Sequence, residues 1–165
     1  MMAIFALLSR LQKEAVTNTT TLRNAIAWSS PLFFRGNDFP YDFCFVPSTL
    51  GDDGDPLDVL ILMDSPVIPG CVVTARLIGA IEAKQRPKDG DWTPNYHLIA
   101  VATHAQLHNT VHSLSDMRPH LLDKIKEFFI GYNKLRNRKF KPQKDAGPRK
   151  ARALLEAGIK AFKKT

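Results

Sequence analysis

The middle of the chain carries short apolar segments separated by turn-forming residues. Residues 59–63 read Val-Leu-Ile-Leu-Met, an unbroken apolar run bounded by Asp, Gly and Pro on one side and Ser-Pro on the other, which is typical of a buried strand. Residues 71–82 and 97–103 are also typical of strands, and the two prolines and one glycine of residues 84–95 predict a long hairpin loop between them. This succession predicts a closed or strongly curved sheet.

The last third of the chain changes to a helical period. Apolar residues recur at helical spacing between residues 121 and 135, and Pro119 is suited to the first turn of that helix. A second helix is predicted after Gly147-Pro148, with one apolar stripe and a basic opposite face. The stripe consists of Ala151, Leu154, Leu155, Ile159 and Phe162. We therefore expect a mainly β, α+β protein with C-terminal helices.

The first residues and the cysteines bear on the compartment. Residues 1–8 are apolar, but no cation precedes them and no small-residue cleavage site follows, so we expect no signal peptide. No run approaches the roughly 18 apolar residues of a membrane span. Cys44 and Cys71 are too few for a disulfide framework and lack the partners of a zinc site. These features predict a cytoplasmic protein without membrane association.

Charge is distributed unevenly along the chain. The net charge is +7, yet 12 of the 23 Lys and Arg residues lie between residues 134 and 165, where there are only two acids. Residues 51–65 hold five aspartates and no Lys or Arg. The basic region could bind nucleic acid, but exposed aromatic candidates are sparse, so we favour a solvated face that concentrates an anionic substrate.

The acidic segment is the strongest chemical signal. Asp53, Asp55 and Asp58 occupy three of six consecutive positions with no basic neighbour. Carboxylates held close together repel one another, and a hard divalent cation such as Mg²⁺ relieves that repulsion. A solvated Asp/Gly turn is the alternative, which the strand-like continuation disfavours. An EF-hand is excluded because Leu57 stands where a calcium ligand is needed.

The residues 53–59, Asp-Gly-Asp-Pro-Leu-Asp-Val, match D-x-D-P-x-D-aliphatic, and the chain thereby resembles the soluble family I inorganic pyrophosphatases. Further blocks of the resemblance lie between residues 38 and 163, among them Phe39-Pro-Tyr-Asp-Phe, Arg76-Leu-Ile-Gly and Lys139-Phe-Lys-Pro. It implies a small five-stranded OB-like barrel flanked by two helices. It also implies a homo-oligomer.

The resemblance implies Mg²⁺-dependent hydrolysis of pyrophosphate to two phosphates, with a metal-bound water attacking one phosphorus. By position, Asp53 and Asp58 look like metal ligands, and Asp55 looks like the residue that binds metal and orients or deprotonates the water. Tyr132 looks like a hydrogen-bond donor to phosphate. Its helical spacing serves packing equally well.

The chain also departs from the family pattern. A Glu, a Lys and an Arg that the family carries upstream have no counterparts, and acids and a cation expected before Leu98 are replaced by Asn95, Tyr96 and His97. We therefore divide the chain into a divergent N-terminal segment, 1–36, and a pyrophosphatase-like domain, 37–165. If the first hairpin is lost, the barrel would have an open edge. A non-catalytic pyrophosphatase-like subunit and, less favoured, a basic nucleic-acid-binding module remain as alternatives.

The histidines at positions 104, 108 and 112 would align on one face of a helix as a metal site. The intervening residues are poor helix formers, and no carboxylate lies in register. We expect a solvated connection here.

Overall fold

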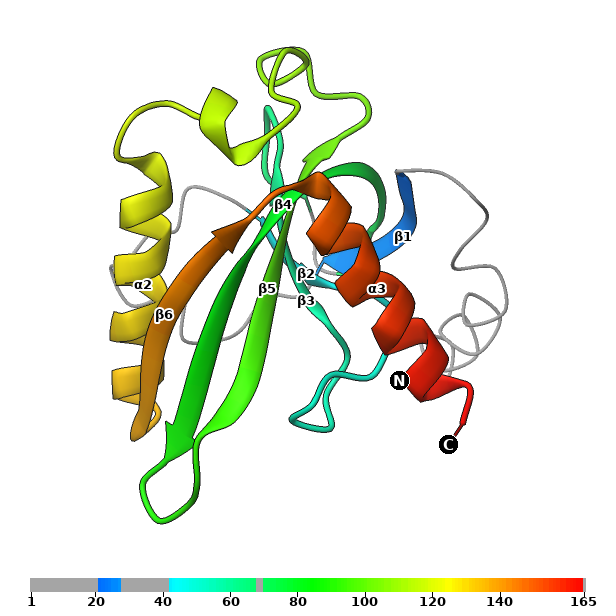
Figure 1. Ribbon diagram of the computed structural model, residues 1–165. Coiled ribbons are helices and arrows are strands. Elements are labelled where there is room, and N and C mark those ends of the chain that lie inside the picture. Colours follow the sequence, from blue (N-terminus) through cyan, green and yellow to red (C-terminus); the bar gives the residue numbers. More distant parts are fainter. Residues whose placement is uncertain (1–20, 28–41, 68–69, 165) are drawn as a thin grey trace.

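The computed structural model describes residues 21–27, 42–67 and 70–164. Its described strands form one sheet in the order β1-β2-β3-β5-β4-β6, and β1 also pairs with β4, so five strands close into a barrel and β6 extends it (Figure 1). The strands are β1 (Thr21–Ala27), β2 (Asp42–Phe45), β3 (Asp58–Leu62), β4 (Val72–Pro87), β5 (Thr93–Ala102) and β6 (Arg138–Ala146). The predicted five-stranded barrel is confirmed.

The centre of the barrel is the parallel pair formed by β3 and β5. Their apolar runs are buried almost throughout, which explains why neither shows an alternating pattern in the sequence. The register places Asp58 opposite His97 and Leu62 opposite Val101. Asp58 is therefore the point at which the acidic segment enters the core.

The hairpin between β4 and β5 differs from the prediction. The two strands extend to Pro87 and from Thr93, so the loop is limited to residues 88–92 instead of 84–95. Pro94 pairs with Lys84, and Pro87 pairs with Arg138 of β6. Both prolines lie near the strand ends at the tip of the hairpin, where a missing N–H donor is tolerated.

Both predicted helices are present, as α2 (Leu121–Leu135) and α3 (Pro148–Phe162). Pro148 occupies the first turn of α3, as expected. Pro119 precedes the N-cap residue of α2, His120, so the prediction that it lies in the first turn was wrong. Helix α2 packs beside β6, and α3 packs across β4 on another side of the barrel (Figure 1).

Strand β6 follows α2 directly, and the sequence did not predict it. In this strand only Phe140 and Ala146 are buried, so its pattern looks like a charged tail. Near the C-terminal end of β6, the facing strand β4 has a glycine, Gly79, where an added Cβ would lie 2.6 Å from the Ala146 carbonyl oxygen and 2.4 Å from Leu114 Cγ. Leu114 begins a short 3-10 helix, η2 (Leu114–Asp116). The glycine therefore permits this close approach.

Strand β1 closes the barrel by pairing with β2 and with β4. No strand was predicted at these residues, and the expected open edge is wrong. Apart from residues 21–27, the N-terminal segment 1–36 lies outside the described residues, as do residues 1–8, for which no signal peptide was expected. Residues 39–41 of the Phe39 block also lie outside them.

Candidate functional site

The acidic segment is part of a closed loop between β2 and β3. Thr49 Oγ1 donates to the Val46 carbonyl oxygen at 2.6 Å and accepts from the Leu57 amide at 2.9 Å. The Val46 amide donates in turn to the Leu57 carbonyl oxygen at 2.9 Å. Because Thr49 and Leu57 are buried, these bonds replace lost hydration and fix both ends of the loop.

Helix α3 supports the same loop from outside. The Leu50 amide donates to the Gly158 carbonyl oxygen at 3.0 Å, and a Cβ on Gly158 would lie 2.6 Å from Leu57 Cδ1. Within the loop, Gly51 donates to the Asp55 carbonyl oxygen at 2.8 Å. Gly54 adopts φ 87°, which a residue with a side chain rarely adopts. Local turn chemistry and α3 together orient the aspartates.

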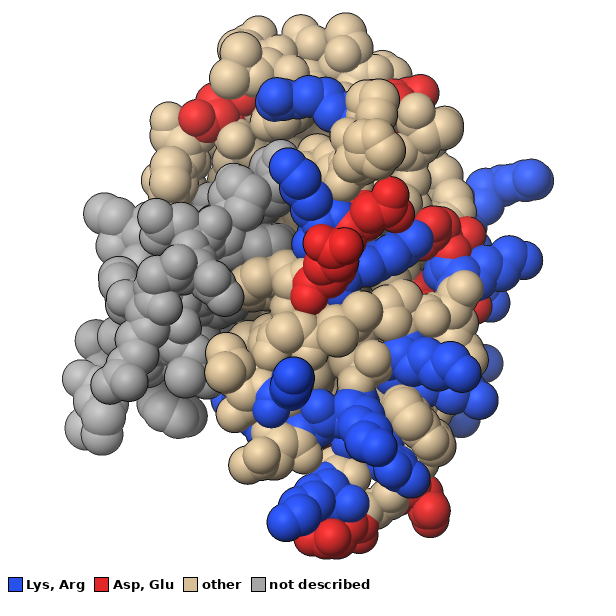
Figure 2. All heavy atoms as spheres, turned by 90° about the vertical axis from the view of Figure 1, so that its left-hand side faces the viewer, with Lys and Arg blue, Asp and Glu red and all other residues tan. Residues whose placement is uncertain are grey.

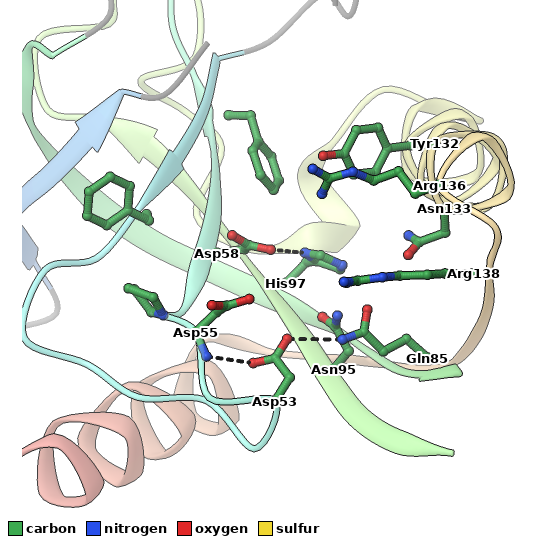
Figure 3. A pocket seen from close by; sticks show the side chains of 13 residues that line it. Asp53, Asp55, Asp58, Gln85, Asn95, His97, Tyr132, Asn133, Arg136 and Arg138 are labelled. Atoms are coloured by element: carbon green, nitrogen blue, oxygen red, sulfur yellow. Dashed lines mark hydrogen bonds and ion pairs between the residues drawn. The ribbon is translucent and has the colours of Figure 1, made fainter. Parts of the chain in front are cut away.

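All four residues predicted for the site line one cavity of about 290 Å³. Asp53, Asp55 and Asp58 face it from the loop and the start of β3, and Tyr132 faces it from α2 (Figure 3). Tyr132 is at least 74 positions away from the aspartates in the chain. It reaches the same cavity because α2 packs beside the barrel. Their roles stay predictions.

Asp58 is the least solvated carboxylate of the cavity. Burial raises its pKa to about 7, and the negative charges of Asp53 and Asp55 add to this effect, while the positive charge of Arg136 opposes it. Burial also raises the pKa of Asp53, although the hydrogen bond from the Asp55 amide opposes this rise. The neighbouring carboxylates thus disfavour the charged form of Asp58, as expected from their spacing.

His97, beside Asp58 in the sheet, is a buried neutral residue. Its Nδ1 lies 3.5 Å from Asp58 Oδ2, and its ring stacks on Phe129 with centroids 3.9 Å apart and planes 9° apart. Burial lowers the pKa of His97 to about 3, so the imidazole is uncharged near neutral pH and the contact with Asp58 is not an ion pair. Neither ring nitrogen has a hydrogen-bond partner among the described residues.

The fit of Mg²⁺ to the aspartates depends on how they are held. Asp53 Oδ2 accepts from Gln85 Nε2 at 3.1 Å, and Oδ1 accepts from the Asp55 amide at 3.3 Å. Among the described residues, no three His, Cys, Asp or Glu side chains are grouped so that they could hold a metal ion by themselves. Mg²⁺ commonly takes one or two carboxylates and completes its shell with water and substrate phosphates, so this donor set fits it.

The wall opposite the aspartates was not predicted. Two arginines, Arg136 at the C-terminal end of α2 and Arg138 at the start of β6, point into the cavity, and the amides of Gln85, Asn95 and Asn133 lie along it (Figure 3). In the sequence both arginines belong to a uniformly basic region. No local signal distinguishes them from their basic neighbours, because strand β6, which places Arg138, was itself not predicted.

Tyr132 combines the two roles considered for it. Its ring stacks on Phe128, one helical turn earlier, with centroids 6.0 Å apart and planes 14° apart. Its hydroxyl end points into the cavity (Figure 3). The packing interpretation and the phosphate-donor interpretation therefore both agree with its placement.

The three histidines do not share a helix face. His104 and His112 are exposed, whereas His108 is buried, so the expectation of a fully solvated connection was wrong for His108. Arg76 holds this connection by donating to the Val111 carbonyl oxygen at 2.7 Å, and it lies 3.1 Å from His112 Nδ1.

No helix among the described residues is long and apolar enough to cross a membrane.

The family model and the similar sequences that match this chain all point to the same protein family. The model of a family described as inorganic pyrophosphatase matches residues 10–163. A protein named inorganic pyrophosphatase from a Nostoc species is 40% identical over 125 residues, which are 76% of this chain and 71% of that protein. One from a Synechocystis species is 42% identical over 104 residues, 63% of this chain and 59% of that protein. The chain thus aligns with roughly 60 to 70% of the length of these relatives.

Comparison with solved structures gives the same fold. An inorganic pyrophosphatase from Coxiella burnetii superposes with a TM-score of 0.74 at 28% identity, covering 90% of this chain and 99% of that one. The enzyme from Helicobacter pylori gives a TM-score of 0.71 at 28% identity, covering 90% and 97%. The similarity extends over barrel and helices alike.

Proposed function

The chain belongs to the inorganic pyrophosphatase family, and on that premise we propose that it hydrolyses inorganic pyrophosphate to two phosphates. The observation that carries the proposal is the convergence of Asp53, Asp55 and Asp58 on one cavity opposite Arg136 and Arg138. A site with carboxylates on one wall and guanidinium groups on the other suits an anionic substrate that arrives with a divalent cation.

We propose Mg²⁺ as the metal, held by Asp53 and Asp58 with Asp55 nearby. When bound, Mg²⁺ supplies positive charge and lowers the pKa of water. Asp55 is exposed at the edge of the cavity, and its backbone amide is fixed on Asp53. Its carboxylate can therefore accept the proton of the water that attacks phosphorus, while the bridging P–O bond breaks and phosphate leaves. The Tyr132 hydroxyl can donate to a phosphate oxygen on the α2 side.

The site lacks a cation at His97, because that side chain is neutral. This agrees with the departures noted in the sequence and is the observation that keeps a non-catalytic pyrophosphatase-like subunit as the second candidate. No comparison supports that alternative or a nucleic-acid-binding module.

The proposed setting is the cytoplasm, with a homo-oligomer as the working form. The proposal rests on the cysteine content, because two cysteines, one buried and one exposed, are too few for the disulfide framework of a secreted protein. Light scattering on the purified chain would measure the oligomeric state.

The proposed activity is tested by phosphate release from pyrophosphate with Mg²⁺, using protein free of host pyrophosphatase. Asp55→Asn and Asp58→Asn should each lower kcat by roughly a hundredfold or more, because each removes a carboxylate that faces the substrate. Asp123→Asn is the matched control, because this aspartate is exposed on α2 outside the cavity. Release by the unmodified chain that does not exceed that of the two variants would reject hydrolysis and favour the non-catalytic subunit.

A further inference from the structure

The junction between α2 and β6 places two guanidinium groups in the cavity, those of Arg136 and Arg138. Among the described residues, the side chain of neither Arg136 nor Arg138 makes a hydrogen bond or an ion pair, although three aspartates line the same space. The charge of Arg136 nevertheless acts on Asp58. Opposite charges that face one another across a cavity without pairing leave room for a ligand between them.

The Arg136 side chain packs on an aromatic ring of α2. Its Cζ lies 5.2 Å from the centre of the Tyr132 ring, and Tyr132 in turn stacks on Phe128. The three residues follow one another at four-residue spacing along α2, so they form a continuous stack. Stacking leaves the edge of the guanidinium free to bind an oxyanion and reduces the conformational entropy lost on binding.

The surface between the arginines and the aspartates is neutral and polar. Gln85, Asn95 and Asn133 line it with amides, and the buried His97 adds a neutral imidazole without a hydrogen-bond partner among the described residues. Because both ring nitrogens are buried, this imidazole adds an uncharged wall to the cavity and not an exposed donor. A phosphoryl group between Arg138 and His97 would therefore meet neutral polar side chains, whereas Asp52 and Asp91 line the adjoining cavity on the other side of Arg138.

The surrounding surface adds to the local positive charge. Figure 2 shows Lys and Arg gathered over the lower part of the face that carries α2 and β6. The end of α2, the junction and the first half of β6 carry five exposed cations, namely Lys134, Arg136, Arg138, Lys139 and Lys141. Such a field raises the local concentration of a small anion, but it does not hold the anion in one position. Specific binding must come from the two arginines that enter the cavity.

We infer that Arg136 and Arg138 form a phosphoryl-binding subsite that holds one end of a diphosphate without any metal ion. The inference rests on the proposed function, since it assigns one end of that substrate to the α2–β6 junction and the other to the aspartates. Arginine forms paired hydrogen bonds with phosphate oxygens, which a point charge on lysine does not reproduce.

The test is calorimetric titration of the full chain with methylenediphosphonate, a non-hydrolysable diphosphate analogue, in EDTA. We expect binding without metal, weakened roughly tenfold by Arg136→Gln and by Arg138→Gln, as for loss of one charge-assisted contact. Arg138→Lys should recover only part of the loss. Lys139→Gln should bind as the unmodified chain does, because successive side chains of a strand point to opposite faces and Lys139 does not line the cavity.

Two results would overturn the inference. One is no detectable binding of methylenediphosphonate in EDTA by a chain whose circular dichroism is that of a folded protein. The other is an equal loss for Lys139→Gln and Arg138→Gln, which would assign binding to general surface charge. Arginine-dependent binding in a chain without phosphate release would support the subsite and reject the proposed hydrolysis, so the two proposals fail separately.

Discussion

The two walls of the cavity are built in opposite ways. The aspartate wall is fixed by the backbone, through the Thr49 hydrogen bonds and the contact between Leu50 and Gly158. The arginine wall consists of exposed side chains that lack hydrogen bonds among the described residues, and Arg136 is held there by aromatic stacking. A rigid acidic wall suits ligands that need fixed geometry, such as a metal ion. An adaptable basic wall suits an anion whose position changes as a bond breaks.

The difference predicts first that the acidic wall is sensitive to packing far from its carboxylates. Gly158→Val should lower the free energy of unfolding by about 3 kcal/mol, because its side chain would collide with the buried Leu57 and push on the loop. Urea denaturation measures the loss, and phosphate release should fall with it.

The matched control is Gly131→Val on α2, where an added Cβ meets nothing within 4 Å. This variant should stay within about 0.5 kcal/mol of the original stability, since valine and glycine differ little in a helix. Equal losses in the two variants would mean that the loop does not depend on close packing against α3.

The second prediction concerns the electrostatic cost of the acidic wall. The pKa of Asp58 is about 7 in the folded protein, above the roughly 3.9 of an unfolded aspartate, so the folded state holds the proton more tightly. The destabilisation is therefore fully present above about pH 7 and disappears as the pH falls toward 4. Asp58→Asn cannot ionise and should stabilise the metal-free protein by about 2 kcal/mol at pH 8, with little effect at pH 4.

Urea denaturation in EDTA at both pH values measures this effect. Asp123→Asn, on the exposed surface of α2, provides the control and should not stabilise the protein at either pH, because it removes a charge in the first turn of the helix, a loss that costs at most about 1 kcal/mol. A loss of stability at pH 8 for Asp58→Asn would contradict the inference that the charged form of Asp58 destabilises the folded protein.

The smallest effect is expected on the basic wall. A double-mutant cycle with Tyr132→Leu and Arg136→Gln should give a coupling energy of about 0.5 kcal/mol in urea denaturation, as for an exposed cation–π pair. A coupling indistinguishable from zero would mean that the stack does not hold Arg136. The contrast with the acidic wall would then be sharper still.

Sequence patterns predicted the elements whose burial is uniform. The runs of β3 and β5 and the stripes of α2 and α3 were recognisable because each buries a continuous face. Strand β6 was missed because it lies at the sheet edge and buries only two residues. Strand β1 was missed because its pairing with β2 and β4 is not encoded in a local pattern.

The candidate site divides in the same way. By itself the sequence determined the acidic wall, because Asp53, Asp55 and Asp58 are neighbours in one loop and their repulsion is evident from their spacing alone. Only the tertiary structure decided the opposite wall, because Gln85, His97 and Arg138 come from three strands and meet through sheet register. It also decided that His97 is neutral, since burial under Phe129 sets the charge of an imidazole and no spacing along the chain encodes burial.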